Sequence, residues 1–439
     1  MPDSQRLSRR RFLQRGAAVA GGAVVPHLIP SGVLAAPDKP GANDRIGIGY
    51  IGVGRRGNQL MGLPPEGQIV GVCDFSRDRA ETTAARRKCR AYSNYHKMLD
   101  AKDIDGVVIA TTDHWHVLPA VHACQAGKDA YVEKPLSLTI REGRVLVNAV
   151  RKYKRVLQTG SQRRSMSGHR LGCELVRNGV AGKIHTVHIL NYPSPWECQL
   201  PGQPIPEGLD WDAWCGQTEP VPFNQDIYIQ RSNPGWISFR PWSGGEMTGT
   251  GAHGFDQIQW ALDMDHTGPV EVWAEGGKME PLVYTQPESR ARGNAYTSKG
   301  RSVTMRYANG IIVKLTANGP AAGGEFIGDR GKIRIGNNRV DSNPEELAKT
   351  PPDSLKFRLP VSNNHLKNWC DCIKSREKPI ADVEIGHRSA IVCHLGNIAR
   401  WVGRKLKWDP ATETFPGDEE ANSHLDRPKR KGYEIPDPA

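Results

Sequence analysis

The 439-residue sequence lacks several features that would assign it to other protein classes. No run of 18 uninterrupted apolar residues occurs, so we expect no membrane span in the mature chain. The nine cysteines do not have the spacing of a disulfide framework, which leaves open a disulfide elsewhere, and Cys370-x-Cys372 has no partner pair for zinc. The formal charge is +12, yet no nucleic-acid-binding motif accompanies it. We therefore expect a soluble globular protein with no metal and no nucleic-acid partner.

The first 36 residues have the pattern of an export signal. Ser8–Gln14 (Ser-Arg-Arg-Arg-Phe-Leu-Gln) matches the twin-arginine motif, and Gly16–Val25 supplies the short apolar segment behind it. Small residues allow cleavage after Ala35 or Ala36. The alternative is a basic tail without a targeting role. The pattern favours export by the twin-arginine pathway, hence a periplasmic location and a protein that folds before it is exported.

The segment Arg45–Gly57 predicts a dinucleotide-binding site. An apolar strand runs into Gly52-x-Gly54-x-x-Gly57, the spacing of a nucleotide-binding turn. The first glycine permits the tight turn, the second lets the backbone approach a diphosphate, and the third lets the following helix lie close to its strand. The alternative is an ordinary structural turn.

An acidic residue in the right place supports the nucleotide interpretation. Asp74 ends the next apolar run, Gln68–Cys73, where a carboxylate accepts hydrogen bonds from a ribose. This carboxylate would repel the 2′-phosphate of NADP, so we expect NAD, although Arg77 and Arg79 would lessen the repulsion.

Strands and helices alternate between residues 44 and 163, which predicts an N-terminal, doubly wound parallel sheet. The buried run Gly106–Ala110 is typical of a parallel strand covered on both faces. The other expected strands are Ile46–Ile51, Gln68–Cys73, Ala130–Val132 and Val156–Gln158, with helices over Val117–Ala126 and from the capping residue Thr139.

Residues 164–408 predict a second, α+β domain with an open, mainly antiparallel sheet. Residues 193–245 are rich in Pro, Gly and Trp and are expected to form a long loop over a cleft. A polar tail is expected over 409–439, with the basic run Arg427–Lys431 exposed to solvent. The expected elements are strands at Ile184–Leu190, Val270–Trp273, Ser302–Arg306, Ile311–Leu315 and Lys332–Ile335, and helices near 169–178, 365–374 and 386–404.

Lys134 is a candidate catalytic residue. It follows the expected strand Ala130–Val132, at the carboxyl edge of the parallel sheet where ligands collect. An amine there would exchange a proton with a substrate hydroxyl. The alternative, a surface lysine before a proline, is equally consistent with its position.

His253 is a second candidate, at the end of the glycine-rich segment Ser243–Ala252. Histidine titrates near neutral pH and suits proton transfer with a hydroxyl group. Asp256 would share a helix face with His253 and hold its ring. The alternative is a histidine that caps or packs a helix.

Two further segments follow strands at the same sheet edge. In Asp113-His114-Trp115-His116 we expect a wall of the cofactor pocket, with Trp115 on the nicotinamide side; a metal site lacks a third ligand. Gln162 and Arg163 are expected to contact substrate, or else to form a solvated basic turn.

The sequence resembles the Gfo/Idh/MocA family of nicotinamide-dependent sugar oxidoreductases, particularly its twin-arginine-exported bacterial members. The resemblance covers about residues 44–430 and rests on Gly52–Gly57, Ala110–His116, Glu133–Pro135, Gly244–His253, Glu325–Gly331 and Asp382–His387. It implies a Rossmann domain followed by an α/β domain, a tightly held NAD or NADP, and frequent homo-oligomers, dimers or tetramers, packed through the open sheet.

The resemblance also implies roles for single residues. Lys134 corresponds to the catalytic lysine and His253 to the catalytic histidine, whereas Gly249 stands where family dehydrogenases usually carry an aspartate. The residues we expect at the cofactor are Gly52, Gly54, Arg55, Arg56, Gly57, Asp74, Thr111, Asp113, Trp115, His116, Glu133 and Lys134, and those at the substrate are Gln162, Arg163, Trp115 and His253.

The leading hypothesis is an NAD(P)-dependent oxidoreductase that acts on a sugar or sugar derivative with a bound, recycled cofactor. Because the aspartate at position 249 is missing, a first alternative is a redox-neutral glycoside hydrolase that oxidises, eliminates, hydrates and reduces its substrate. A second alternative is a non-catalytic sugar-binding protein with a structural NAD.

Overall fold

The computed structural model describes residues 40–41, 44–229, 234–285 and 300–438. Contacts divide the chain into Met1–Arg45 and Ile46–Ala439, and every element below belongs to the second part. The predicted export signal, residues 1–36, lies outside the described residues. Among the residues that are described, no helix is long and apolar enough to cross a bilayer.

A six-stranded sheet in the order β3-β2-β1-β4-β5-β6 forms the first half of this part, and all its strand pairs are parallel. This is the strand order of dinucleotide-binding folds. Every residue of β1, β4 and β5 is buried, because continuous apolar runs are covered on both faces. The strands are β1 Ile46–Ile51, β2 Gly67–Cys73, β3 Arg90–Tyr92, β4 Gly106–Ile109, β5 Asp129–Val132 and β6 Leu157–Thr159.

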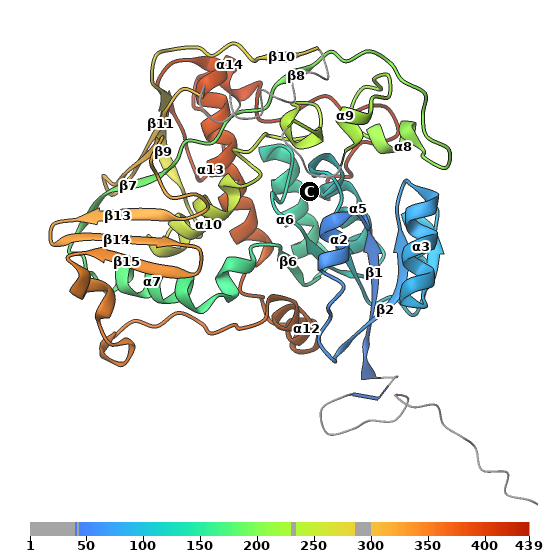
Figure 1. The fold of residues 1–439 in the computed structure, drawn as a ribbon, viewed down its shortest axis with the longest axis horizontal. Helices are drawn as coiled ribbons and strands as arrows, with labels where there is room; N and C mark the ends of the chain where they lie inside the picture. The colour runs from blue at the N-terminus through green and yellow to red at the C-terminus, as the bar shows by residue number, and fades with distance from the viewer. Residues whose placement is uncertain (1–39, 42–43, 230–233, 286–299, 439) are drawn as a thin grey trace, which may run out of the picture. The chain divides into compact units, whose positions relative to one another are not determined.

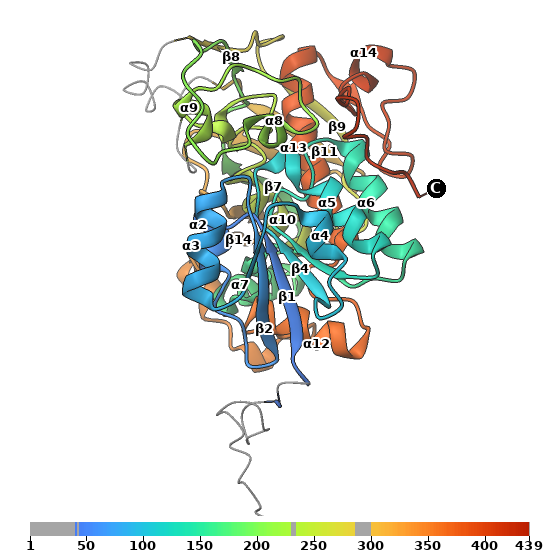
Figure 2. The ribbon, with the colours of Figure 1, turned by 90° about the vertical axis from the view of Figure 1, so that its right-hand side faces the viewer.

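Helices cover both faces of this parallel sheet, with α2 and α3 on one side and α4, α5 and α6 on the other (Figure 2). Thr139 caps α6 as predicted, and its hydroxyl accepts a hydrogen bond from the Glu142 N–H at 3.2 Å. The predicted doubly wound sheet is confirmed. Its helices are α2 Arg55–Gln59, α3 Arg77–Arg87, α4 Tyr95–Leu99, α5 Val117–Gln125 and α6 Ile140–Lys152.

The second sheet has eight strands in the order β15-β14-β13-β7-β12-β11-β9-β16. Its pairs are antiparallel except β7 with β12, so the predicted mainly antiparallel sheet is confirmed. In β7, Val187 and Ile189 are buried and alternate with the half-buried Thr186 and His188. The strands are β7 Ile184–Leu190, β9 Pro269–Ala274, β11 Val303–Tyr307, β12 Ile312–Thr316, β13 Gly324–Gly328, β14 Gly331–Gly336, β15 Arg339–Asn343 and β16 Leu406–Lys407.

Helix α13 joins the two sheets. Its 20 residues pack against α6 of the first half and against α10 and β9 of the second, and Figure 1 shows it between them. Most of α13 is buried, as expected for a helix covered on several sides. The main helices of the second half are α7 Ser167–Arg177, α10 Gly251–Ala261, α12 His365–Ser375 and α13 Val383–Val402.

The segment 193–245 was predicted as a loop, but it has a core of its own. It contains α8 Trp211–Cys215, α9 Gln225–Tyr228 and the strand β8 Glu197–Cys198, which pairs with β10 Val283–Tyr284. Its aromatic rings pack on one another, which lets a chain with few hydrogen-bonded elements keep a fixed shape. The buried members of this cluster include Trp196, Trp211, Trp214, Phe223, Phe239 and Trp242.

The C-terminal residues were expected to be a polar tail, with the run 427–431 in solvent. The second expectation holds for Lys431, which is exposed, and is wrong for Lys429, which pairs with Glu142 at 2.7 Å and whose side chain is only 13 % exposed. Short helix α14 Glu419–Asn422 also belongs to this segment, and Phe415 and Leu425 are buried. The ion pairs of Lys429 with Glu142 and of Arg430 with Asp212 therefore hold these two residues against the protein.

Candidate active site

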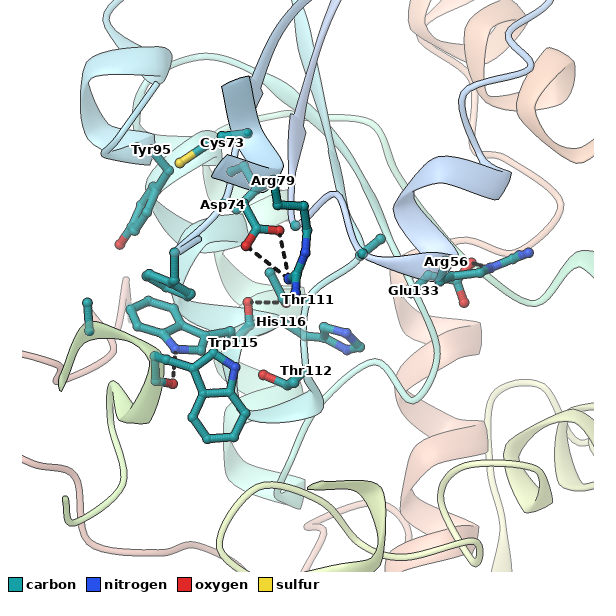
Figure 3. Close-up of a pocket in the computed structure, with 18 of the residues that line it drawn as sticks. Arg56, Cys73, Asp74, Arg79, Tyr95, Thr111, Thr112, Trp115, His116 and Glu133 are labelled. Atoms are coloured by element: carbon teal, nitrogen blue, oxygen red, sulfur yellow. Dashed lines mark hydrogen bonds and ion pairs between the residues drawn. The ribbon is translucent and has the colours of Figure 1, made fainter. Parts of the chain in front are cut away.

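A cavity of about 920 Å³ lies at the carboxyl edge of the parallel sheet (Figure 3). Residues of the first half, of the segment 193–245 and of α10 line it together. This edge is where open parallel sheets bind ligands. The predicted site residues that line the cavity are Gly52, Gly54, Arg55, Arg56, Asp74, Thr111, Asp113, Trp115, His116, Glu133, Lys134, Gln162 and His253.

The three glycines of the nucleotide-binding motif have different steric reasons to be glycine. Gly52 has φ +84, and a Cβ there would lie 2.9 Å from the carbonyl carbon of Ala110. A Cβ on Gly57 would lie 2.2 Å from the Gly52 carbonyl oxygen, so glycine is needed here for the helix to pack against the turn. Gly57 does not line the cavity. At Gly54 no atom lies within 4 Å of the Cβ position. That free space beside the cavity suits a diphosphate.

Asp74 is held at the end of β2 by several donors. Its Oδ2 accepts from the Val53 N–H at 2.9 Å and its Oδ1 from the Ser76 N–H at 3.0 Å. Arg79 forms an ion pair with Asp74 at 3.2 Å (Figure 3). It also donates a hydrogen bond to the Tyr228 hydroxyl at 2.9 Å. The segment 193–245 thereby contacts the place where a ribose would bind.

Glu133 is fixed beside the predicted catalytic lysine. Arg56 Nε lies 2.8 Å from Glu133 Oε1, and the Glu133 side chain is 5 % exposed. Gly160 leaves the room that this carboxylate needs, because a Cβ there would lie 2.8 Å from Glu133 Cδ. Arg56 and the space at Gly160 therefore set the position of the Glu133 carboxylate next to Lys134.

Lys134 and His253 come from different halves of the fold and line the same cavity. The Lys134 Nζ donates to the Gly249 carbonyl oxygen at 2.9 Å. Gly249 lies just before α10, and His253 is the third residue of that helix. A backbone carbonyl thus contacts the amine at the position where the resemblance implied an aspartate. An amine and an imidazole on one cavity are the groups needed to move a hydroxyl proton.

Two buried polar atoms on the cavity have no hydrogen-bond partner among the described residues: His116 Nε2 and Gln162 Oε1. His116 Nδ1 lies 2.6 Å from the Pro135 carbonyl oxygen, so Nδ1 donates and Nε2 is left as an acceptor in the neutral ring. Buried acceptors of this kind are costly unless a ligand or water satisfies them. Together with the Gly54 space and Asp74, they fit a polar ligand such as a dinucleotide.

Family models match almost the whole described chain. The Rossmann model of the Gfo/Idh/MocA family, described as NAD-binding, matches residues 46–161, and the model of its C-terminal alpha/beta domain matches residues 175–435. The chain belongs to the Gfo/Idh/MocA oxidoreductase family. The predicted family and its two-part fold are therefore confirmed.

Curated relatives in this family resemble only part of the chain. A glycosyl hydrolase family 109 protein of Shewanella pealeana is 32% identical over 165 residues, which are 31% of this chain and 35% of the relative. An inositol 2-dehydrogenase of Salmonella typhimurium is 31% identical over 153 residues, 34% of this chain and 44% of the relative. The matched regions thus span less than half of each relative's length.

Solved structures share the fold at low identity. The WlbA dehydrogenase from Bordetella pertussis, in complex with NADH and UDP-GlcNAcA, has a TM-score of 0.59 at 18% identity and covers 83% of this chain and 99% of its own. The myo-inositol dehydrogenase from Lactobacillus casei, in complex with NAD(H) and myo-inositol, has a TM-score of 0.54 at 17% identity, with 83% and 97% covered.

Trp115 does not lie where we expected it in this family member. Its ring packs against Phe75, the residue after Asp74, with centroids 5.0 Å apart, so it belongs to the Asp74 end of the cavity. Its Nε1 donates to the Trp214 carbonyl oxygen at 2.9 Å. His114 Nε2 lies 2.8 Å from the same oxygen, and burial lowers the pKa of His114 to about 3. Both side chains therefore attach the segment 193–245 to the first half.

For two predicted site residues, the contacts seen in the structure are not with the groups that the sequence predicted. Arg163 donates to the Ala322 carbonyl oxygen at 2.6 Å and is not among the residues that line the cavity, so its substrate contact stays a prediction. Asp256 accepts from Arg164 Nε at 2.9 Å and from the Ser389 hydroxyl at 3.0 Å. These contacts tie Asp256 to the core, and its role in holding His253 stays a prediction.

Several lining residues were missed because they come from segments without a motif. Trp214, Tyr228 and Ile237 belong to the segment 193–245, whose density of aromatic residues was the available signal. Tyr433 lies close to the C-terminus, and no pattern in the sequence pointed to it.

All nine cysteines are free thiols, and no group of three potential ligands for a metal ion occurs in the described part of the chain.

Proposed function

We propose that the protein is an NAD(P)-dependent oxidoreductase that transfers a hydride between nicotinamide and a hydroxyl-bearing carbon of a sugar or sugar derivative. One observation carries this proposal: a single cavity has a nucleotide-type glycine turn and Asp74 in one part, and Lys134 with His253 in another. Relatives named as inositol dehydrogenases support a polyhydroxylated substrate.

The chain's own residues would bind the substrate and move its proton. The nicotinamide, when bound, supplies the hydride acceptor or donor. Gly249 directs one N–H of Lys134 and so fixes the amine, while His253 lines the same cavity from α10. The substrate hydroxyl would lose its proton to one of these two groups as the carbonyl forms. His116 and Gln162 would add hydrogen bonds through their buried, unsatisfied acceptor atoms.

NAD is the proposed cofactor, because we assign Asp74 to the ribose and its carboxylate would repel a 2′-phosphate there. Arg79 is already paired with Asp74 and Tyr228, which weakens its use as a phosphate ligand.

The first experiment is to release nucleotide from purified protein and identify it by mass, then follow NADH absorbance with a panel of sugars and cyclitols. If no nucleotide accompanies the protein and calorimetry detects no uptake of NAD or NADP, the proposal fails.

A redox-neutral glycoside hydrolase is the second candidate. It is favoured by the backbone carbonyl of Gly249 at Lys134, and by the 32% identity with a family 109 glycosyl hydrolase over 165 residues. In that reaction a ring hydroxyl is oxidised, the neighbouring carbon loses a proton, the aglycone is eliminated, water adds and the carbonyl is reduced again. With a nitrophenyl glycoside, release of nitrophenol without net NADH supports this candidate, whereas NADH formation alone supports the first.

We also propose export through the twin-arginine pathway and assembly into a homo-oligomer through the open face of the eight-stranded sheet. Changing Arg9 and Arg10 together to lysine should retain the protein in the cytoplasm, as cell fractionation would show. Light scattering of the mature protein measures the oligomeric state, and a monomeric mass would contradict assembly.

A further inference from the structure

The C-terminal segment Leu425–Pro438, here called the strap, contacts α6 at both ends of the helix. The Leu425 carbonyl oxygen accepts from the Arg141 N–H at 3.0 Å, near the start of the helix. The Pro438 carbonyl accepts from Lys152 Nζ at the end of the helix. Figure 2 shows this dark red segment beside α5 and α6. The strap therefore adheres to the nucleotide-binding half of the fold.

The strap also holds the segment 193–245. The Arg430 N–H donates to the Gln217 carbonyl oxygen at 3.0 Å, and Arg430 Nη2 lies 2.6 Å from Asp212 Oδ2. Asp212 belongs to α8, next to Trp214, which lines the cavity. The strap thus ties a wall of the cavity to α6.

One strap side chain reaches the cavity itself. The Tyr433 ring lies edge-on to Trp115, with centroids 5.7 Å apart and planes at 81°, and Tyr433 and Gly432 line the cavity. Trp115 in turn packs on Phe75 at 5.0 Å and on Tyr95 at 6.1 Å. Four aromatic rings from four separate segments therefore meet at one end of the cavity.

This aromatic end lies on the adenine side of the proposed nucleotide. Phe75 directly follows Asp74, the predicted ribose ligand, and in Figure 3 Tyr95 and Trp115 lie away from Glu133 and Arg56. The base is attached to the same ribose, so it must lie beside that end. Aromatic side chains bind bases by stacking, whichever base it is.

We propose that the strap completes the adenine site, with Tyr433 contacting the base, and so retains the dinucleotide. The inference rests on the proposed function, since it needs a nucleotide in the cavity. It assigns to the C-terminal segment a part in binding the cofactor. Loss of one aromatic contact to a base should weaken binding about 10-fold.

The test uses the full-length protein with Tyr433→Ala and, as a matched control, Ile435→Ala. Both side chains pack against the same apolar cluster, but Ile435 does not line the cavity. Calorimetry with NAD and with ADP-ribose, after removal of bound nucleotide, gives the affinities. We expect Tyr433→Ala to weaken both ligands by the same factor, about 10-fold, and Ile435→Ala to change them by less than about twofold. Tyr433→Phe should restore most of the affinity, because the ring remains.

The outcomes separate the inference from the proposed function. Failure of the unchanged protein to bind NAD would overturn the proposed function. Binding by the unchanged protein with equal affinities in Tyr433→Ala would overturn the inference alone. An effect on NAD without one on ADP-ribose would also overturn it, because the contact would then lie on the nicotinamide half. Melting temperatures of all variants show whether each one is folded.

Discussion

The two ends of the cavity are built in different ways. Gly52, Gly54, Gly57 and Asp74 belong to the nucleotide end, and all four lie in or directly beside the consecutive elements β1, α2 and β2. The chemical end combines Lys134 after β5 with Gly249 and His253 at the start of α10. Contacts within one supersecondary unit set the glycine turn and the position of Asp74, to which Tyr228 and the strap add contacts from other segments. The chemical end, by contrast, exists only through docking of the two halves.

This difference teaches which properties depend on the whole fold. The nucleotide end should bind its ligand through backbone geometry that three glycines set locally. The chemical end should work only while α10 stays in place against the parallel sheet. Substitutions can therefore separate binding from catalysis, and the predictions below use that separation.

Lys134→Met should show the largest effect. Loss of a general acid–base group costs roughly 100- to 10,000-fold in kcat, while nucleotide affinity should change little. Lys128→Met is the matched control, because Lys128 Nζ also donates to a backbone carbonyl, that of Ala101 at 3.0 Å, but lies outside the cavity. Steady-state rates and NAD affinity are measured on both. Full turnover of a sugar by Lys134→Met would support a non-catalytic role for this lysine.

Asp74→Asn should lower nucleotide affinity at the nucleotide end of the cavity and leave the rate of the chemical step little changed. It removes a carboxylate that can bind the ribose, so NAD affinity should fall by about 10- to 100-fold. NADP affinity should fall less or rise, because repulsion is lost and Arg79 loses its ionic partner. Asp78→Asn, an exposed change on α3, is the control. Equal losses for NAD and NADP in calorimetry would contradict the assignment of Asp74 to the ribose.

Gly54→Ala should weaken NAD on the order of tenfold without unfolding the protein, because its Cβ enters free space that a diphosphate would occupy. Gly62→Ala is the control, since it too has no atom within 4 Å of the Cβ position and lies outside the cavity. Thermal melts and NAD titrations check both. Unchanged affinity in Gly54→Ala would place the diphosphate elsewhere.

A fall in pH should lower the free energy of unfolding, because buried histidines join the two halves of the fold. His365 Nε2 lies 2.9 Å from the Thr159 carbonyl and His394 Nε2 3.1 Å from that of Ser137, so each joins a helix of the second half to the first. Burial lowers the pKa of both imidazoles to about 4, below the unfolded value of roughly 6.5. Their contribution to stability is present above pH ~6.5 and is lost as the pH falls toward 4.

The expected loss is about 1–2 kcal/mol per histidine by pH 5, seen as a lower midpoint of urea unfolding. His394→Gln should reduce the dependence of this midpoint on pH, whereas His185→Gln, on the exposed side of β7, should not. A midpoint that stays constant between pH 7 and 5 would contradict buried neutral imidazoles at these positions.

The sequence predicted the local end of the cavity better than the assembled one. The Gly52–Gly57 turn and the strand ends after β4 and β5 follow from periodicity and glycine spacing, and all lie at the cavity. Arg163 was predicted at the substrate, and its side chain donates to the Ala322 carbonyl, about 160 residues away in the chain, a contact that no local pattern could predict. Trp115 and Tyr433 meet only through tertiary packing, which no local pattern reports.

The attachment of the segment 193–245 has a consequence for anyone who would redesign this enzyme. Trp214 offers one carbonyl oxygen to both Trp115 and His114, and Tyr228 contacts the arginine that pairs with Asp74. The segment that we expect to contact the substrate is therefore attached to the residues that we expect to bind the coenzyme. Substitutions that change substrate selectivity should therefore also change coenzyme affinity, and variants selected for one property should be assayed for both.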